Sequence, residues 1–162
     1  MSPIARIFAA GAALAAMATA GVAVAQNYSL NPAYGTVNIS AGFTPDPYVV
    51  NVLSGGRTDA SSAVSSSCRG FIAEAPDVRV NYTSGSFPLI FSVRSSADTT
   101  LVINGPDGQW YCDDDGGNAG MNPAVRFGSP ASGQYDVWIG TYGNASNQEA
   151  QLYVSELDGN TQ

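Results

Sequence analysis

The residues with the clearest chemical potential are the carboxylates in the stretch YCDDDGGNAG, residues 111–120. Asp113, Asp114 and Asp115 stand side by side there, and a glycine-rich turn follows them. Like charges this close repel one another, and a hard divalent cation would remove the repulsion. Calcium is such a cation, because it accepts roughly six to eight oxygen ligands from carboxylates, carbonyls and water in flexible geometry.

A predicted β-hairpin would position these carboxylates. The sequence GPDG at residues 105–108 is typical of a turn, and pairing Asn104 with Gln109 across it sets the register of the flanking strands. Directly paired residues share a face, and the faces alternate along each strand. This register predicts one apolar face directed at the core, consisting of Leu101, Ile103, Trp110 and Cys112.

The other side of the same hairpin would gather the charges near its open end. Extending the register places Asp98 opposite Asp115, with Asp113 on the same side. We predict a calcium site at Asp98, Asp113 and Asp115, with Asn118 and the carbonyls of the neighbouring turn as further ligands. The segment is not an EF-hand loop, because Gly117 stands where the third ligand of that pattern belongs.

Two interpretations without a metal remain open for the same carboxylates. They can form a solvated turn whose charge keeps a sheet edge from pairing with other chains. Alternatively, Arg94 or Arg126 can neutralise them. Neither alternative requires a ligand, so a binding measurement separates both from the calcium hypothesis.

The absence of histidine from the whole sequence narrows the possible chemistry. Ser-His-Asp and Cys-His mechanisms need an imidazole base, and common catalytic zinc sites depend on histidine ligands. Carboxylate-pair catalysis needs no histidine, but no pair of Asp or Glu residues is marked out for it. We therefore predict that the protein is not an enzyme.

The first 25 residues have the pattern of a secretory signal peptide. Arg6 precedes an alanine-rich apolar stretch, and Ala23-Val24-Ala25 before Gln26 is an A-x-A cleavage pattern. We predict that the mature chain is secreted or periplasmic, and the alternative is a retained membrane anchor. No second apolar run approaches the roughly 20 residues of a membrane span, so no membrane insertion is expected after the signal is removed.

Residues 26–162 are strongly acidic. Five of the six basic residues, all arginine, lie in this part together with all 13 acidic residues, which leaves a formal charge of −8. Such a chain lacks the basic surface that neutralises phosphate groups. We therefore predict that nucleic acid is not a partner.

The two cysteines, Cys68 and Cys112, are expected to form a disulfide. An even pair in an exported chain favours a bridge over two free thiols, which oxidising compartments disfavour. The chain-entropy model gives roughly 4 kcal/mol for closing a loop of about 45 residues. The bridge would therefore be a major source of stability.

Short β-rich runs separated by Gly, Pro, Asn and Ser predict an all-β fold. The clearest runs are 48–53, 77–82, 89–93, 99–104 and 134–139. We predict a single antiparallel β-sandwich of jelly-roll type over residues 26–157. Residues 57–67 are expected to form a loop, and residues 158–162 a frayed tail.

Four pieces of the segment from Asp98 to Tyr142 form a combination of motifs. They are DTTL at 98–101, DG at 107–108, DDG at 114–116 and SGQYDVWI at 132–139. In this combination the chain resembles the bacterial pre-peptidase C-terminal domain family, as a standalone secreted member. The resemblance implies a β-sandwich of jelly-roll type, a domain that usually follows secreted proteases as a non-catalytic appendage. Some relatives bind calcium, and some bind matrix polymers.

The sequence therefore predicts a non-enzymatic exported β-sandwich that binds a protein or an extracellular polymer, with calcium as its cofactor. Two alternatives stay open: a structural envelope protein without metal, and an accessory or regulatory domain of a secreted peptidase. Trp138 and Tyr142 either form a platform on which sugar rings stack or belong to the core of the sandwich.

Overall fold

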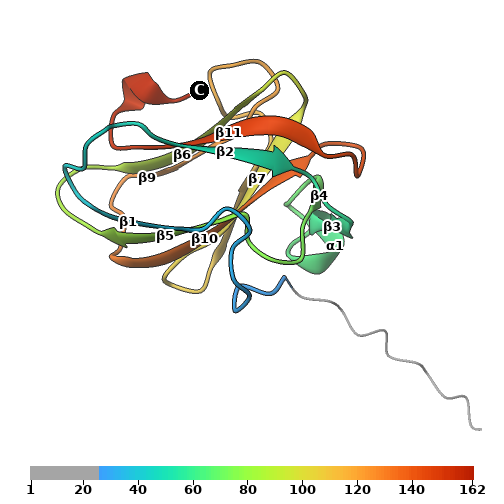
Figure 1. The fold of residues 1–162 in the computed structure, drawn as a ribbon, viewed down its shortest axis with the longest axis horizontal. Helices are drawn as coiled ribbons and strands as arrows, with labels where there is room; N and C mark the ends of the chain where they lie inside the picture. The colour runs from blue at the N-terminus through green and yellow to red at the C-terminus, as the bar shows by residue number, and fades with distance from the viewer. Residues whose placement is uncertain (1–25) are drawn as a thin grey trace, which may run out of the picture.

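The computed structural model describes residues 26–162, and the predicted signal peptide, residues 1–25, lies outside the described residues. The described chain folds into two β-sheets packed face to face, with few helical residues (Figure 1). This architecture confirms the predicted all-β sandwich. No helix of residues 26–162 is long and apolar enough to cross a membrane.

The larger sheet has seven strands arranged around a central strand, β10. Its strands are β1 (Thr36–Ser40), β3 (Thr58–Asp59), β4 (Phe71–Ile72), β5 (Val78–Thr83), β7 (Thr99–Asn104), β8 (Trp110–Asp113) and β10 (Gly133–Thr141). Strands β4, β5 and β7 each pair with β10. β1 lies beyond β5, β3 beyond β4, and β8 beyond β7. All these pairs are antiparallel except β1 with β5, which is parallel.

The smaller sheet has four antiparallel strands in the order β2-β11-β6-β9. Its strands are β2 (Tyr48–Ser54), β6 (Leu89–Ser95), β9 (Ala124–Phe127) and β11 (Gln148–Ser155). Alternate residues of both sheets meet between them, as the period of a strand requires. On β5, for example, Val78, Val80 and Tyr82 are buried in this main core, while Arg79 and Asn81 lie on the opposite face.

The β7–β8 hairpin differs from its predicted register by one residue, because Asn104 pairs with Trp110 and not with Gln109. The cause is local. The Asp107 carboxylate accepts the N–H of Gln109 at 3.0 Å, and the Gly105 N–H donates to the Gln109 carbonyl at 2.9 Å. Gln109 therefore belongs to the loop, and the loop is one residue longer than predicted.

A slip of one residue exchanges the two faces of a strand. The predicted placement of Trp110 and Cys112 in the core between the sheets is therefore wrong. Both residues pack on the outer face of the larger sheet, while Tyr111 contacts the main core. Leu101 and Ile103 do lie in the main core, as predicted.

A second, smaller core covers part of this outer face. Its buried members are Ala60, Cys68, Ile72, Val102 and Trp138. The predicted disulfide between Cys68 and Cys112 is confirmed, with a Cα–Cα distance of 5.2 Å. It ties the loop that carries Cys68 to strand β8, so that this loop covers one end of the sheet.

The loop expected at residues 57–67 contains β3 and a short helix, α1 (Ala60–Ala63). Asp59 caps the helix, because its carboxylate accepts the Ser61 N–H at 2.9 Å. A single helical turn is too short to produce a helical period in the sequence, which explains why the sequence pattern does not predict it.

The C-terminal residues are packed on the smaller sheet rather than frayed. They contain a 3-10 turn, η1 (Asp158–Asn160). Asp158 forms an ion pair with Arg126 of β9 at 2.7 Å, and the Gln162 N–H donates to the Ser92 hydroxyl of β6 at 3.1 Å. The predicted tail therefore covers part of the outer face of the smaller sheet.

Candidate functional site

Two of the predicted calcium ligands, Asp113 and Asn118, form hydrogen bonds within the chain. Asp113 accepts the N–H of Gly116 at 2.6 Å and the N–H of Ala124 at 2.9 Å through one carboxylate oxygen. It therefore closes the turn after β8 and fastens it to the start of β9. Asn118 donates its side-chain N–H to the Thr161 carbonyl at 3.2 Å, so it holds the C-terminal segment.

Asp98 has a different environment. One of its carboxylate oxygens is buried without a hydrogen-bond partner. Partial burial raises the pKa of Asp98, and repulsion from the charges of Asp115 and Asp114 raises that pKa further. The charges that act on Asp98 are therefore those of Asp115 and Asp114.

Within residues 26–162, no three acidic or cysteine side chains are grouped so that they could hold a metal ion. No part of the function proposed below depends on calcium. The calcium hypothesis stays a prediction, and the unfolding measurement that tests it is given in the Discussion.

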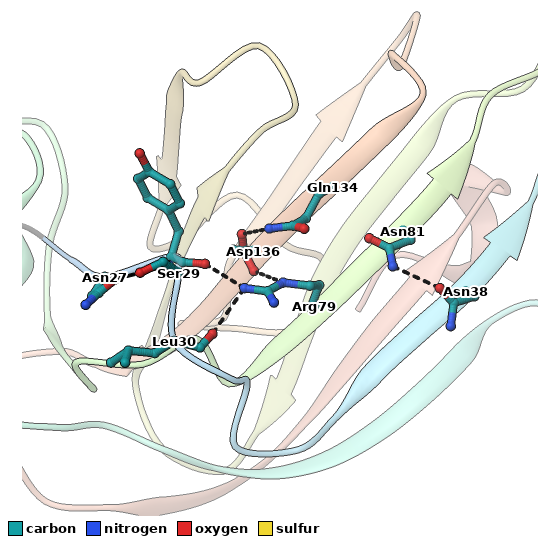
Figure 2. Close-up of polar contacts among 9 residues, drawn as sticks. Asn27, Ser29, Leu30, Asn38, Arg79, Asn81, Gln134 and Asp136 are labelled. Carbon is teal, nitrogen blue, oxygen red and sulfur yellow. Dashed lines mark hydrogen bonds and ion pairs between the residues drawn. The ribbon is translucent and has the colours of Figure 1, made fainter.

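A second candidate site lies on the outer face of the larger sheet, where β1, β5 and β10 are adjacent. The register places Asn38 beside Asn81 and Asn81 beside Gln134, so three side-chain amides form one row across three strands. The Asn81 amide N–H donates to the Asn38 side-chain oxygen at 2.9 Å (Figure 2). The first two amides of this row are therefore held in place by each other.

An ion pair lies in the next row. The Arg79 guanidinium donates to the Asp136 carboxylate at 2.7 Å, and the side chain of Asp136 is only 2% exposed. Gln134 donates to the other oxygen of Asp136 at 2.7 Å, which connects the ion pair to the amide row. Figure 2 shows Arg79 between Asp136 and the segment that precedes β1.

That N-terminal segment is fastened to the face by the same arginine. Arg79 donates to the backbone carbonyls of Tyr28 at 2.6 Å and Leu30 at 3.1 Å. Arg79 therefore holds the backbone of this segment beside the sheet. We call Asn38, Arg79, Asn81, Gln134 and Asp136 the polar face.

Two open hollows accompany the polar face. One, of about 530 Å³, is lined by residues of β1 and β5, including Asn38 and Asn81. The other, of about 560 Å³, is lined by Tyr28, Trp110 and the turn after β7. They share residues 132–134 and therefore adjoin each other, and we call the two hollows together the groove.

Gly133 is required where the two hollows meet. Its φ of +143° lies in the region that side chains rarely adopt, and an added Cβ would stand 2.6 Å from the Cβ of Pro106. A glycine here lets the turn after β7 approach the start of β10 closely. The floor of the groove therefore depends on this residue.

Sequence reasoning did not identify the polar face. The alternation in β5 and β10 does predict which residues point away from the core. However, Asn38 comes from β1, whose parallel pairing with β5 joins segments that are about 40 residues apart, as the pairing of Asn38 with Asn81 shows. The platform considered at Trp138 is wrong, because Trp138 is fully buried, while Tyr142 is 45% exposed.

Comparisons with known proteins add little. No family model matches the chain, and no curated protein matches it by sequence. Among solved structures it is similar to Aeromonas hydrophila PliG, a periplasmic lysozyme inhibitor of g-type lysozyme, with 11% identity and a TM-score of 0.35. The match covers 74% of this chain and 96% of PliG. A similarity at this level assigns neither fold nor function. The resemblance to the pre-peptidase C-terminal domain family stays a prediction.

Proposed function

We propose that the mature protein is a non-enzymatic β-sandwich that binds a partner outside the cytoplasm through the polar face. The observation that carries this proposal is the row of amides and the ion pair beside it, which are connected by hydrogen bonds on the outer face of the sheet. Side chains fixed before binding lose less conformational freedom when a ligand arrives.

The hydrogen bonds within the polar face leave one end of each side-chain amide available for another partner. Asn38 is bonded through its oxygen, which leaves its N–H groups, while Asn81 and Gln134 are bonded through N–H groups, which leaves their oxygens. The face therefore presents donors and acceptors at fixed positions.

A role without catalysis is supported by the residue types. The sequence contains no histidine, and the carboxylate of the polar face, Asp136, is held in an ion pair at 2.7 Å. Both oxygens of this carboxylate already accept hydrogen bonds, one from Arg79 and the other from Gln134, each at 2.7 Å. The disulfide supports a secreted or periplasmic location, since such bridges persist in oxidising compartments.

The experiment that tests the proposal is site-specific photo-crosslinking in cells that produce the protein. Photo-reactive benzoylphenylalanine replaces Ser40, which lines the groove, or Val49, which is 41% exposed on the smaller sheet. We expect an adduct from position 40 and none from position 49. Equal labelling at both positions, or no adduct at either, would contradict the proposal and favour a structural envelope protein.

The identity of the crosslinked partner tests the alternative that the protein is an accessory domain of a secreted peptidase. In that case the adduct from position 40 would contain the peptidase, and proteolysis and mass spectrometry of the adduct would identify it. This outcome would also give experimental support to the resemblance to the pre-peptidase C-terminal domain family.

A further inference from the structure

We propose that the ligand of the polar face is a neutral, hydroxyl-rich glycan chain, an inference that rests on the binding function proposed above. Each sugar hydroxyl can donate one hydrogen bond and accept others. The row from Asn38 through Asn81 to Gln134 offers both kinds of partner, since N–H groups of the first residue and oxygens of the other two are left over.

The charge of the face selects a neutral ligand. Arg79 and Asp136 compensate each other, and their side chains are 16% and 2% exposed. The rest of the chain is acidic, with a formal charge of −8 over residues 26–162, so a polyanionic polymer would be repelled. The groove therefore favours an uncharged ligand over an acidic polysaccharide.

The apolar side chains of the groove suit sugar rings better than they suit a protein. Among the large apolar side chains exposed on residues 26–162, only Tyr28, which is 53% exposed, lines the two hollows. Protein interfaces have a larger apolar centre with buried anchor residues. Tyr28 and the half-buried Trp110 instead provide two aromatic rings beside a polar floor, against which the C–H faces of sugar rings can pack.

The length of the groove suits a chain and not a single sugar. It runs from Asn38 on β1, across β5, β10 and β7, to Trp110 on β8. Neighbouring strands are about 4.8 Å apart, so this path is roughly 19 Å long. Several consecutive sugar units could therefore contact the polar face at once.

The test is native affinity electrophoresis of the mature protein in gels that contain one soluble polysaccharide each. The neutral probes are dextran, mannan, galactan and mixed-linkage β-glucan, and the anionic probe is polygalacturonate. We expect at least one neutral probe to retard the protein and polygalacturonate not to do so. Retardation by none of the four neutral probes, or by the anionic probe alone, would overturn the inference.

Matched variants locate the binding. Asn81→Ala with Gln134→Ala removes two amides of the polar face, whereas Asn51→Ala with Gln151→Ala removes a hydrogen-bonded amide pair from the smaller sheet. We expect the first double variant to bind the retarding polysaccharide at least tenfold more weakly and the second to bind like the wild type. Equal binding by both would contradict a site on the polar face.

A variant at Trp110 tests the aromatic part of the groove. Binding should quench the fluorescence of Trp110, and Trp110→Phe should lose that change while keeping an aromatic ring against Trp138, whose ring centroid lies 5.4 Å away. An unchanged spectrum of the wild type on saturation would argue against stacking at Trp110.

The two proposals fail in different ways. A position-40 adduct in which mass spectrometry finds peptides of a second protein, and which periodate leaves intact, would support binding at the polar face and overturn the glycan inference. An adduct that periodate degrades would support both proposals.

Discussion

Replacing Asp77 by asparagine should make the protein more stable at alkaline pH. Asp77 is only 2% exposed, and it follows directly on a proline at the entry to β5. Burial raises the pKa of Asp77 to about 7, although its carboxylate accepts the Ile139 N–H of β10 at 2.7 Å, which acts in the opposite direction. The folded protein therefore holds a proton that the unfolded chain releases near pH 4.

The sign of the effect follows from the two pKa values. Between about pH 4 and pH 7 the unfolded chain is ionised at Asp77 while the folded chain remains protonated. The native state then binds more protons, so the free energy of unfolding falls as the pH rises through this window. A difference of about three pKa units corresponds to a loss of about 4 kcal/mol. Asparagine keeps an oxygen for the Ile139 N–H and cannot ionise.

The assay is urea unfolding of the wild type and Asp77→Asn at pH 4 to 8. We expect similar free energies of unfolding at pH 4 and an advantage of up to about 4 kcal/mol for the variant at pH 8. Asp59→Asn is the control, because Asp59 is an exposed helix cap whose pKa is lowered by hydrogen bonds from Ser61. Curves for the wild type and Asp77→Asn that stay parallel across the range would refute the reasoning.

Three further predictions address the framework of the site. Replacing both Cys68 and Cys112 by serine removes a disulfide with a sequence separation of 44. We expect the free energy of unfolding, measured in urea, to fall by roughly 4 kcal/mol. A fall of less than about 1 kcal/mol would contradict the idea that the disulfide stabilises the fold by constraining the unfolded chain. Gly133→Ala should lower the free energy of unfolding by about 1–3 kcal/mol, because Gly133 has a positive φ and its new Cβ would stand 2.6 Å from the Cβ of Pro106. The loss should exceed that of Gly143→Ala, since Gly143 also has a positive φ but no atom within 4 Å of an added Cβ. The calcium hypothesis predicts that millimolar calcium raises the unfolding midpoint by several degrees relative to EDTA, with magnesium as the control. That rise should disappear in Asp98→Asn, and identical midpoints in calcium and EDTA would exclude a stabilising site.

Local sequence patterns were sufficient to predict much of the framework. The β-rich runs at 48–53 and 99–104 coincide closely with β2 and β7, and the alternation at 77–82 coincides closely with β5. The disulfide followed from the export pattern and the number of cysteines. These features depend on residues near one another in the chain or on composition, so they can be recognised before the fold is known.

The hairpin shows where local reasoning fails. One side-chain hydrogen bond, from the Gln109 N–H to Asp107, lengthens the loop and exchanges the faces of β8. As a result, Cys112 points away from the main core, and Asp113 closes a turn rather than joining Asp98. A pattern of alternating residues cannot distinguish two registers that differ by one position when both faces carry apolar residues.

The sequence alone determined that this chain is an acidic all-β domain without histidine, because composition and short-range alternation depend on no distant contact. Only the tertiary structure decided where a ligand could bind. Asn38, Asn81 and Gln134 come from three segments, and each is an ordinary exposed residue of its own strand. Their chemistry arises only when long-range pairing places them in one row, and no local signal in the sequence encodes that pairing.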